Sequence, residues 1–136
     1  MNLQSIFSFR TPDRIMDKSL LTFSLPDLLK KIKLEKAWKT SSKNAITLSK
    51  NPSMKVVLVA LHDRAELNFH GSGNIISAQI IEGSLLFKTD KHTTVLKKGS
   101  LLTCHECMSH TLLAIEESAV LLTILATSGD QDFMGL

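Results

Sequence analysis

The chain has 136 residues, of which 43% are hydrophobic and 21% are charged. These values are typical of one soluble globular domain. The formal charge of +3 is too small an excess to indicate nucleic-acid binding. No apolar run reaches the roughly 20 residues that cross a bilayer, and the first residues lack the pattern of a signal peptide. We therefore expect a cytoplasmic protein that binds neither membrane nor nucleic acid.

Residues 1–43 are expected to form an arm and a helix packed on the main domain. Residues 1–19 show no periodicity and predict the arm. A helix start follows, because Ser24 is a capping residue, proline occupies the first turn and Asp27 has the position of a capping-box acid. Leucine and isoleucine then recur at helical spacing. The pattern predicts a helix over residues 25–37, with Trp38 packing near its end.

Two groups of side chains are predicted to face solvent. The predicted helix is crowded with lysines, namely Lys30, Lys31, Lys33, Lys36 and Lys39. Such a stretch is typical of a solvated helix face. His62 and His92 lie at turn sequences, and turns lie at the surface, so we expect both imidazoles to be exposed.

From residue 44 onward, short apolar or alternating runs recur about every ten residues, with turn residues between them. The runs are Ala45–Leu48, Lys55–Leu61, Glu66–Phe69, Ile75–Ile81, Ser84–Lys88, Thr93–Leu96, Ser100–Cys104, His110–Ile115 and Val120–Leu125. Many short strands at this spacing predict an all-β sandwich or barrel. We expect the barrel over residues 44–127 and a fraying tail over residues 128–136.

Residues 64–114 resemble the two motifs of the cupin superfamily. In the first motif a glycine, two histidines, a glutamate and a closing glycine follow one another at fixed spacing. At these positions the chain carries Arg64, His70, Ser72, Ile76 and Gly83. The spacing is kept throughout, whereas the residue type is kept only at His70 and Gly83.

The second motif contains a glycine, a proline, a second glycine, a histidine and an asparagine. The corresponding positions hold Gly99, His105, Cys107, His110 and Ala114, so Gly99 and His110 keep the family's residue. The resemblance covers residues 44–125. It implies a cupin-type double-stranded β-helix, the RmlC-like jelly-roll barrel, with one N-terminal α-helix.

In metal-binding cupins three histidines and one glutamate hold the ion, and the resemblance implies His70, Ser72, Ile76 and His110 as the equivalent set. Serine is a poor ligand, and isoleucine cannot coordinate a metal. Two imidazoles seldom hold a divalent ion, because structural zinc sites usually supply four ligands and catalytic zinc sites three. We therefore expect no cofactor. If one binds, it should be a divalent transition metal held by His70 and His110.

Cys104 and Cys107 are separated by two residues. One such pair is compatible with a metal site, with a redox pair and with two small side chains that fill apolar space. Two cysteines are too few for a disulfide framework. The sequence leaves these three roles open.

The resemblance places His70 and His110 on neighbouring strands, pointing inward at one end of the barrel. Strand alternation adds Ala78 and Ile80 to the face of Ile76, and Leu112 and Ala114 to the face of His110. The expected pocket is lined by His70, Ser72, Ile76, Ala78, His110 and Leu112. Its walls are mostly apolar, which suits a small apolar or aromatic compound. A core filled by side chains is the alternative.

Two functions are compatible with this site. The first is a small-molecule-binding barrel without a complete metal site. The second is a metal-dependent enzyme, a dioxygenase or an isomerase, that uses His70 and His110; whether the chain is an enzyme stays open. A sugar epimerase of the family's kind is not expected, because its mechanism pairs a histidine with a tyrosine and the chain has no tyrosine. Open sheet edges are often covered by a second chain, so we expect a homodimer.

Overall fold

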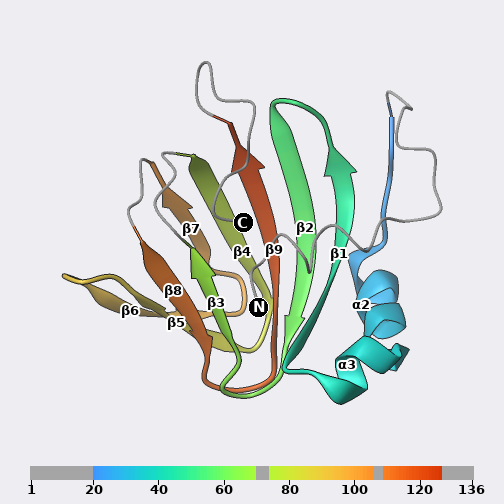
Figure 1. Ribbon diagram of the computed structural model, residues 1–136, viewed down its shortest axis with the longest axis horizontal. Helices are drawn as coiled ribbons and strands as arrows, with labels where there is room; N and C mark the ends of the chain where they lie inside the picture. The colour runs from blue at the N-terminus through green and yellow to red at the C-terminus, as the bar shows by residue number, and fades with distance from the viewer. Residues whose placement is uncertain (1–19, 70–73, 106–108, 127–136) are drawn as a thin grey trace.

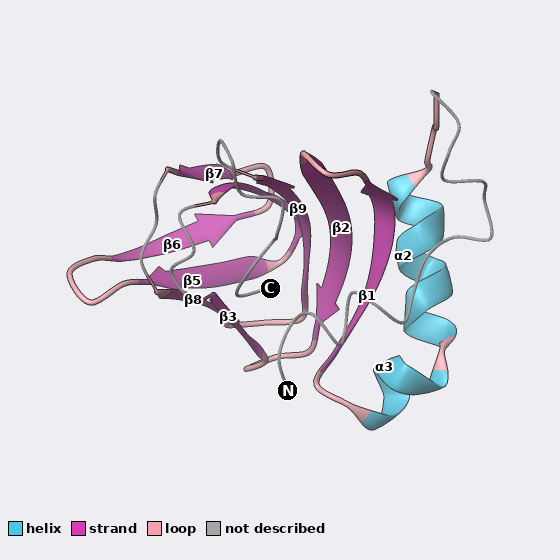
Figure 2. Ribbon diagram, turned by 45° about the horizontal axis from the view of Figure 1, so that its top comes forward, coloured by secondary structure: helices cyan, strands magenta, loops and turns pink. Residues whose placement is uncertain are grey.

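A computed structural model describes residues 20–69, 74–105 and 109–126. Two antiparallel sheets face each other, and the helices lie outside strand β1 (Figure 1, Figure 2). The five-stranded sheet has the order β1 (Lys43–Lys50), β2 (Met54–Leu61), β9 (Ser118–Leu125), β4 (Ile75–Glu82) and β7 (Leu101–Cys104). The four-stranded sheet has the order β3 (Glu66–Phe69), β8 (His110–Ala114), β5 (Ser84–Lys88) and β6 (Thr93–Lys97). This arrangement is the predicted all-β jelly roll.

Every predicted apolar run forms a strand in the described part of the chain. β3 and β5 have the predicted ends, whereas β1 extends beyond the predicted run at both ends. The alternation that predicted the strands also builds the core, because side chains of one parity from both sheets meet between them. In β3, for example, Leu67 and Phe69 are buried while Glu66 and Asn68 are exposed.

One apolar cluster, which we call the interior core, lies between the two sheets. It contains Ala45, Val57, Val59, Leu61, Ala65, Leu67, Phe69, Ile76, Ala78, Ile80, Leu85, Phe87, Leu96, Leu112, Ala114, Val120, Leu122 and Ile124. All strands of both sheets except β7 contribute buried members, and Leu102 of β7 packs against the cluster.

The prediction of one helix over residues 25–37 is wrong at its C-terminal end. α2 (Leu25–Leu34) begins as predicted, because the Ser24 hydroxyl accepts a hydrogen bond from the amide of Asp27 (3.5 Å). It stops where Glu35 takes an extended conformation (φ −79°, ψ 153°), and a second helix, α3 (Lys36–Thr40), follows. The side-chain amide of Asn44 donates to the carbonyl of Ile32 (2.9 Å), so a strand residue satisfies an acceptor at the helix end.

The two helices cover the outer face of β1, β2 and β9 through a second apolar cluster, which we call the helix-side core. Its buried members are Leu29, Ile32, Trp38, Ile46, Leu48, Leu58, Ala60 and Ala119. The five-stranded sheet is therefore buried on both faces along these strands. Lys30, Lys31, Lys36 and Lys39 are exposed as predicted, whereas Lys33 is half-buried. Over the described ranges, no helix has both the length and the apolar character needed to span a membrane.

Three of the motif positions that are glycine in cupins have left-handed backbone here. Gly83 has φ +80°, Gly99 has φ +89° and Arg64, at the first motif's opening position, has φ +72°. Arg64 is the one non-glycine residue with positive φ in the described part of the chain. A left-handed conformation strongly favours glycine. Arg64 keeps this conformation at a position that is glycine in cupins, which supports the alignment of the sequence to the motifs.

Candidate functional site

The candidate site lies at one end of the barrel, which we call the His110 end. β3 ends and β4 begins at this end, and β7 ends and β8 begins there as well (Figure 1). The strand pairing also aligns a row of residues across the five-stranded sheet here. Lys55 pairs with Ile124, Ile124 with Ile76, and Ile76 with Cys104.

His110 opens strand β8 and is only 5% exposed. It pairs directly with Phe69 of β3, and the two rings are stacked with centroids 4.5 Å apart and planes at 12°. Phe87 of β5 lies against the same imidazole, with centroids 5.3 Å apart and planes at 54°. Because two aromatic rings pack on the imidazole, its polar chemistry is confined to the two nitrogens on the ring edge.

The predicted inward residues that the structure describes lie in the interior core. Ile76, Ala78 and Leu112 are all buried there. Ile80 and Ala114 belong to the same cluster. Their role as the wall of a ligand pocket stays a prediction.

Several predicted site residues lie outside the described residues, namely His70, Ser72 and Cys107. Cys104 is half-buried at the end of β7, opposite Ile76. The role of the cysteine pair therefore stays a prediction. Among the side chains that the structure describes, no three of the types His, Cys, Asp and Glu gather as a potential metal site.

Lys55 is the site residue that sequence reasoning missed. It lies near the start of β2 and is 5% exposed. β2 and β9 pair in an unbroken register, so Lys55 lies on the same face as Ile124, which belongs to the interior core. The parity that it shares with Val57 and Val59 was the available signal.

Burial has an electrostatic consequence for Lys55. Removal of the ammonium group from water, with a smaller contribution from the nearby charge of Lys50, lowers the pKa of Lys55 from its ordinary 10.5 to about 8. The group is therefore still mainly protonated at neutral pH. The buried polar and charged side chains of the described residues are Asn44, Thr47, Lys55, Asn74, His110 and Ser118. None of them is acidic, so the ionisable groups buried in this part of the protein are basic.

The prediction that His62 is exposed is wrong. The residue is half-buried, and its ring stacks on Trp38 of α3 with centroids 3.5 Å apart and planes at 17°. Its Nε2 atom lies 2.8 Å from the carbonyl oxygen of Trp38, which can only accept, so Nε2 carries the proton. In the turn after β2, His62 packs against α3, whereas Asp63 and Arg64 are exposed. His92, by contrast, is exposed as predicted.

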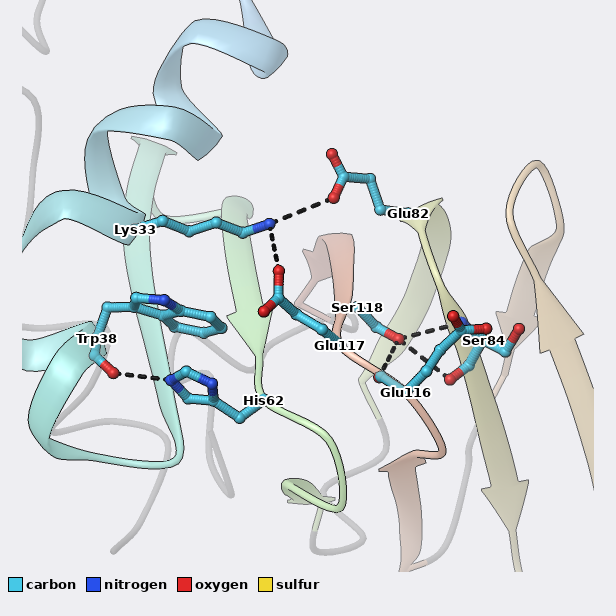
Figure 3. A network of polar contacts seen from close by, with 8 residues as sticks. All are labelled: Lys33, Trp38, His62, Glu82, Ser84, Glu116, Glu117 and Ser118. Carbon is cyan, nitrogen blue, oxygen red and sulfur yellow. Dashed lines mark hydrogen bonds and ion pairs between the residues drawn. The ribbon is translucent and has the colours of Figure 1, made fainter.

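A polar network beside the Trp38–His62 ring stack connects α2 to the barrel (Figure 3). The Lys33 ammonium lies 2.9 Å from Glu117 and 3.3 Å from Glu82, and it lies 5.9 Å from the ring centroid of Trp38. Partial burial lowers the pKa of Lys33, but hydrogen bonds and Coulombic attraction to Glu117 and Glu82 outweigh it and raise the pKa above 10.5. These contacts join the helix to the last residue of β4 and to the turn between β8 and β9, so we assign them a structural role.

No family model matches the chain, and no curated protein matches it either. Solved structures do share its fold. A conserved protein of unknown function from Streptococcus pyogenes is 15% identical, with a TM-score of 0.63, over 85% of this chain and 95% of that one. The cupin domain of Schizosaccharomyces pombe Cnp3 is 19% identical, with a TM-score of 0.60, over 65% of this chain and 68% of that one.

An RmlC-like cupin protein from Desulfovibrio desulfuricans is 17% identical, with a TM-score of 0.56, over 82% of this chain and 97% of that one. Identities at this level are informative about fold and not about activity. Together with the strand order and the left-handed motif positions, these structural similarities define the chain as a small domain of cupin fold.

Proposed function

We propose that this cupin barrel binds a small molecule at the His110 end without a complete set of metal ligands. The observation that supports the proposal is the imidazole of His110, buried on the inner face between Phe69 and Phe87. Small-molecule sites combine apolar walls with a few placed polar groups. Here Ile76, Ala78 and Leu112 are the proposed apolar wall, and the edge of His110 is a polar anchor.

The described residues do not fit a metal ion of the usual cupin kind. Ile76 stands at the position of the glutamate ligand and has no donor atom. His110 is the one member of the implied ligand set that is described and can coordinate a metal. We therefore derive no metal-dependent reaction, and we propose His110 as a hydrogen-bonding residue.

An NMR titration tests ligand binding at this end. Neutral benzamide is a suitable first probe, because it combines an aromatic ring with one polar group. We expect it to shift resonances of His110, Phe69 and Phe87, and we expect His110→Phe to abolish the shifts. His92→Phe changes an exposed histidine and is the matched control. If neither benzamide nor benzoate shifts any of these resonances, the proposal is wrong.

The metal-dependent enzyme that uses His70 and His110 is the alternative, and metal analysis distinguishes it. Protein purified without chelators should contain no stoichiometric transition metal if the proposal is right. A near-stoichiometric metal that is lost in His110→Ala would instead favour the enzyme. The expected homodimer is a separate part of the proposal, and light scattering on the purified protein tests it.

A further inference from the structure

We infer that two copies of this chain pair through the outer face of the four-stranded sheet, around a two-fold axis that runs parallel to its strands. The inference rests on the homodimer that is part of the proposed function. It adds the surface, the relative orientation of the two copies and the side chains that meet. It is independent of any ligand at the His110 end.

An apolar row crosses the centre of this outer face. Strand pairing sets Leu113 of β8 beside Leu86 of β5, and Leu86 beside Val95 of β6. Ile115 is the next outward residue after Leu113, and its amide donates to the carbonyl of Ser84 (3.1 Å), which keeps it beside β5. Val95 is 49% exposed and Ile115 46% exposed. The solvent face of an antiparallel sheet is usually polar, so four adjacent apolar side chains indicate a contact surface.

The two sheets differ in what covers their outer faces. α2 and α3 pack on the outside of the five-stranded sheet, on the far side of the molecule from β3, β8, β5 and β6 (Figure 1, Figure 2). Within the described ranges, no helix therefore covers the outside of the four-stranded sheet. A cover for its apolar row has to come from outside this part of the chain.

The charges of this face identify the cover, because they differ in sign between its two halves. Glu66 lies on β3 at one edge, whereas Lys88 and Lys97 lie on β5 and β6 toward the other edge. Lys43 of β1 donates to the Glu66 carbonyl (2.8 Å) and offsets part of the negative charge. Apart from Glu117, which binds Lys33, the other exposed charges are Asp63, Arg64 and Glu116 on the β3–β8 side and Asp90, Lys91 and Lys98 on the β5–β6 side. The first side is therefore negative and the second positive.

A face with oppositely charged halves is complementary to itself after a two-fold rotation. Packed sheets keep their strand directions within about 30° of each other, so an axis parallel to the strands sets β3 and β8 against β6 and β5 of the second copy. Leu113 then faces the partner's Leu86, and Glu66 lies beside the partner's Lys97. An apolar centre within a charged rim is the usual composition of a protein interface.

The same charges exclude the other simple arrangement. An axis perpendicular to the strands would set each Glu66 against the partner's Glu66, and like charges across an interface are unfavourable. A foreign partner would not require the two halves of the face to complement each other. A second copy is therefore the occupant that the charges favour.

Sedimentation velocity on the full chain tests the apolar centre. We expect a reversible monomer–dimer equilibrium between about 1 and 200 μM protein. Val95→Lys should raise the dimer dissociation constant at least about tenfold, because it places a charge in the apolar row of both copies. Leu101→Lys is the matched control, since Leu101 is a 62% exposed leucine on the edge strand β7 of the other sheet. It should leave the dissociation constant unchanged.

Charge reversal tests the orientation. Glu66→Lys and Lys97→Glu should each raise the dissociation constant about threefold to tenfold, because each places like charges side by side at two symmetric contacts. The double variant restores opposite charges, so its dissociation constant should return to within about twofold of the unmodified protein. A folding defect in either single variant would not be repaired in this way.

The outcomes separate the inference from the proposals on which it rests. If Val95→Lys dimerises as tightly as the unmodified protein, the inference is wrong while the homodimer stands. Two weakened single variants with no recovery in the double variant would refute the strand-parallel axis. A chain that is monomeric up to about 200 μM would refute both the homodimer and the inference, and is the result expected if residues 1–19 or 127–136 cover the face. Benzamide binding at the His110 end is measured separately and is decided by none of these results.

Discussion

Replacement of Lys55 by methionine should stabilise the protein at neutral pH. The substitution keeps an unbranched side chain of similar length and removes the charge that the interior disfavours. In most proteins the loss of a buried lysine's contacts would be expected to lower the unfolding free energy. Here the pKa of about 8, lowered from 10.5 mainly by burial, indicates that the charged form is disfavoured overall.

The magnitude follows from proton linkage. Below pH 8 the lysine is protonated in both the folded and the unfolded chain, so the folded state bears the full cost. The difference between 10.5 and about 8, discounted for solvent screening of a partly accessible ammonium group, corresponds to about 1–2 kcal/mol. Between these two values the unfolded chain binds more protons than the folded one, so the stability of the unmodified protein rises with pH. Lys55→Met lacks this group, and its advantage should therefore be largest near neutral pH and decrease by about 1–2 kcal/mol as the pH reaches 10.5.

Urea unfolding at a series of pH values checks this prediction. The quantity to compare is the difference in unfolding free energy between Lys55→Met and the unmodified protein at each pH. Lys88→Met, measured in parallel, accounts for other groups that titrate in the same range. A methionine variant that is less stable at neutral pH, or a difference that does not change with pH, would refute the reasoning.

Three further predictions test the fold by the same unfolding measurement. Asn44→Ala should cost about 1–3 kcal/mol, because it removes the side-chain hydrogen bonds to the Glu35 carboxylate and to the carbonyl of Ile32, which keeps only the longer bond from the Glu35 amide (3.4 Å); no loss of stability would contradict this. Arg64→Gly should stabilise by about 0.5–1 kcal/mol, since relief of the left-handed backbone (φ +72°) exceeds the added entropy of the unfolded chain, whereas Arg64→Ala should not. Gly83→Ala should cost at least about 2 kcal/mol more than Gly99→Ala. Both glycines have positive φ, but an added Cβ would overlap backbone and side-chain atoms only at Gly83 and meets open space at Gly99; equal costs would contradict the overlap.

The strands could be predicted from the sequence because their signal is local. β3 and β5 were predicted to the residue, since apolar alternation and the flanking turns determine both ends. The helix end was not predictable in this way. It depends on Asn44, which is distant in the chain and reaches the carbonyl of Ile32 only once β1 is in place.

The burial of a side chain was hardest to predict where it depends on another element of the fold. His62 was expected in water because turns usually are, but its environment is set by Trp38 of another element. Lys55 was predicted only as part of a strand and received no role, although strand parity places it on the inner face with Val57 and Val59. In the candidate site, Ile76 and His110 were found by motif spacing, whereas the stacking of Phe69 and Phe87 on His110 requires strand pairing that spacing does not provide.

The helix-side core has a practical consequence for anyone who engineers this barrel. A version trimmed to start at Lys43 would retain every strand of the described residues, yet it would leave Ile46, Leu48 and Leu58, which now pack under the helices, in contact with water. An uncovered apolar patch beside an edge strand invites self-association. Loop grafting, domain fusion and shortened expression products of this scaffold should therefore carry residues 24–40 along with the barrel.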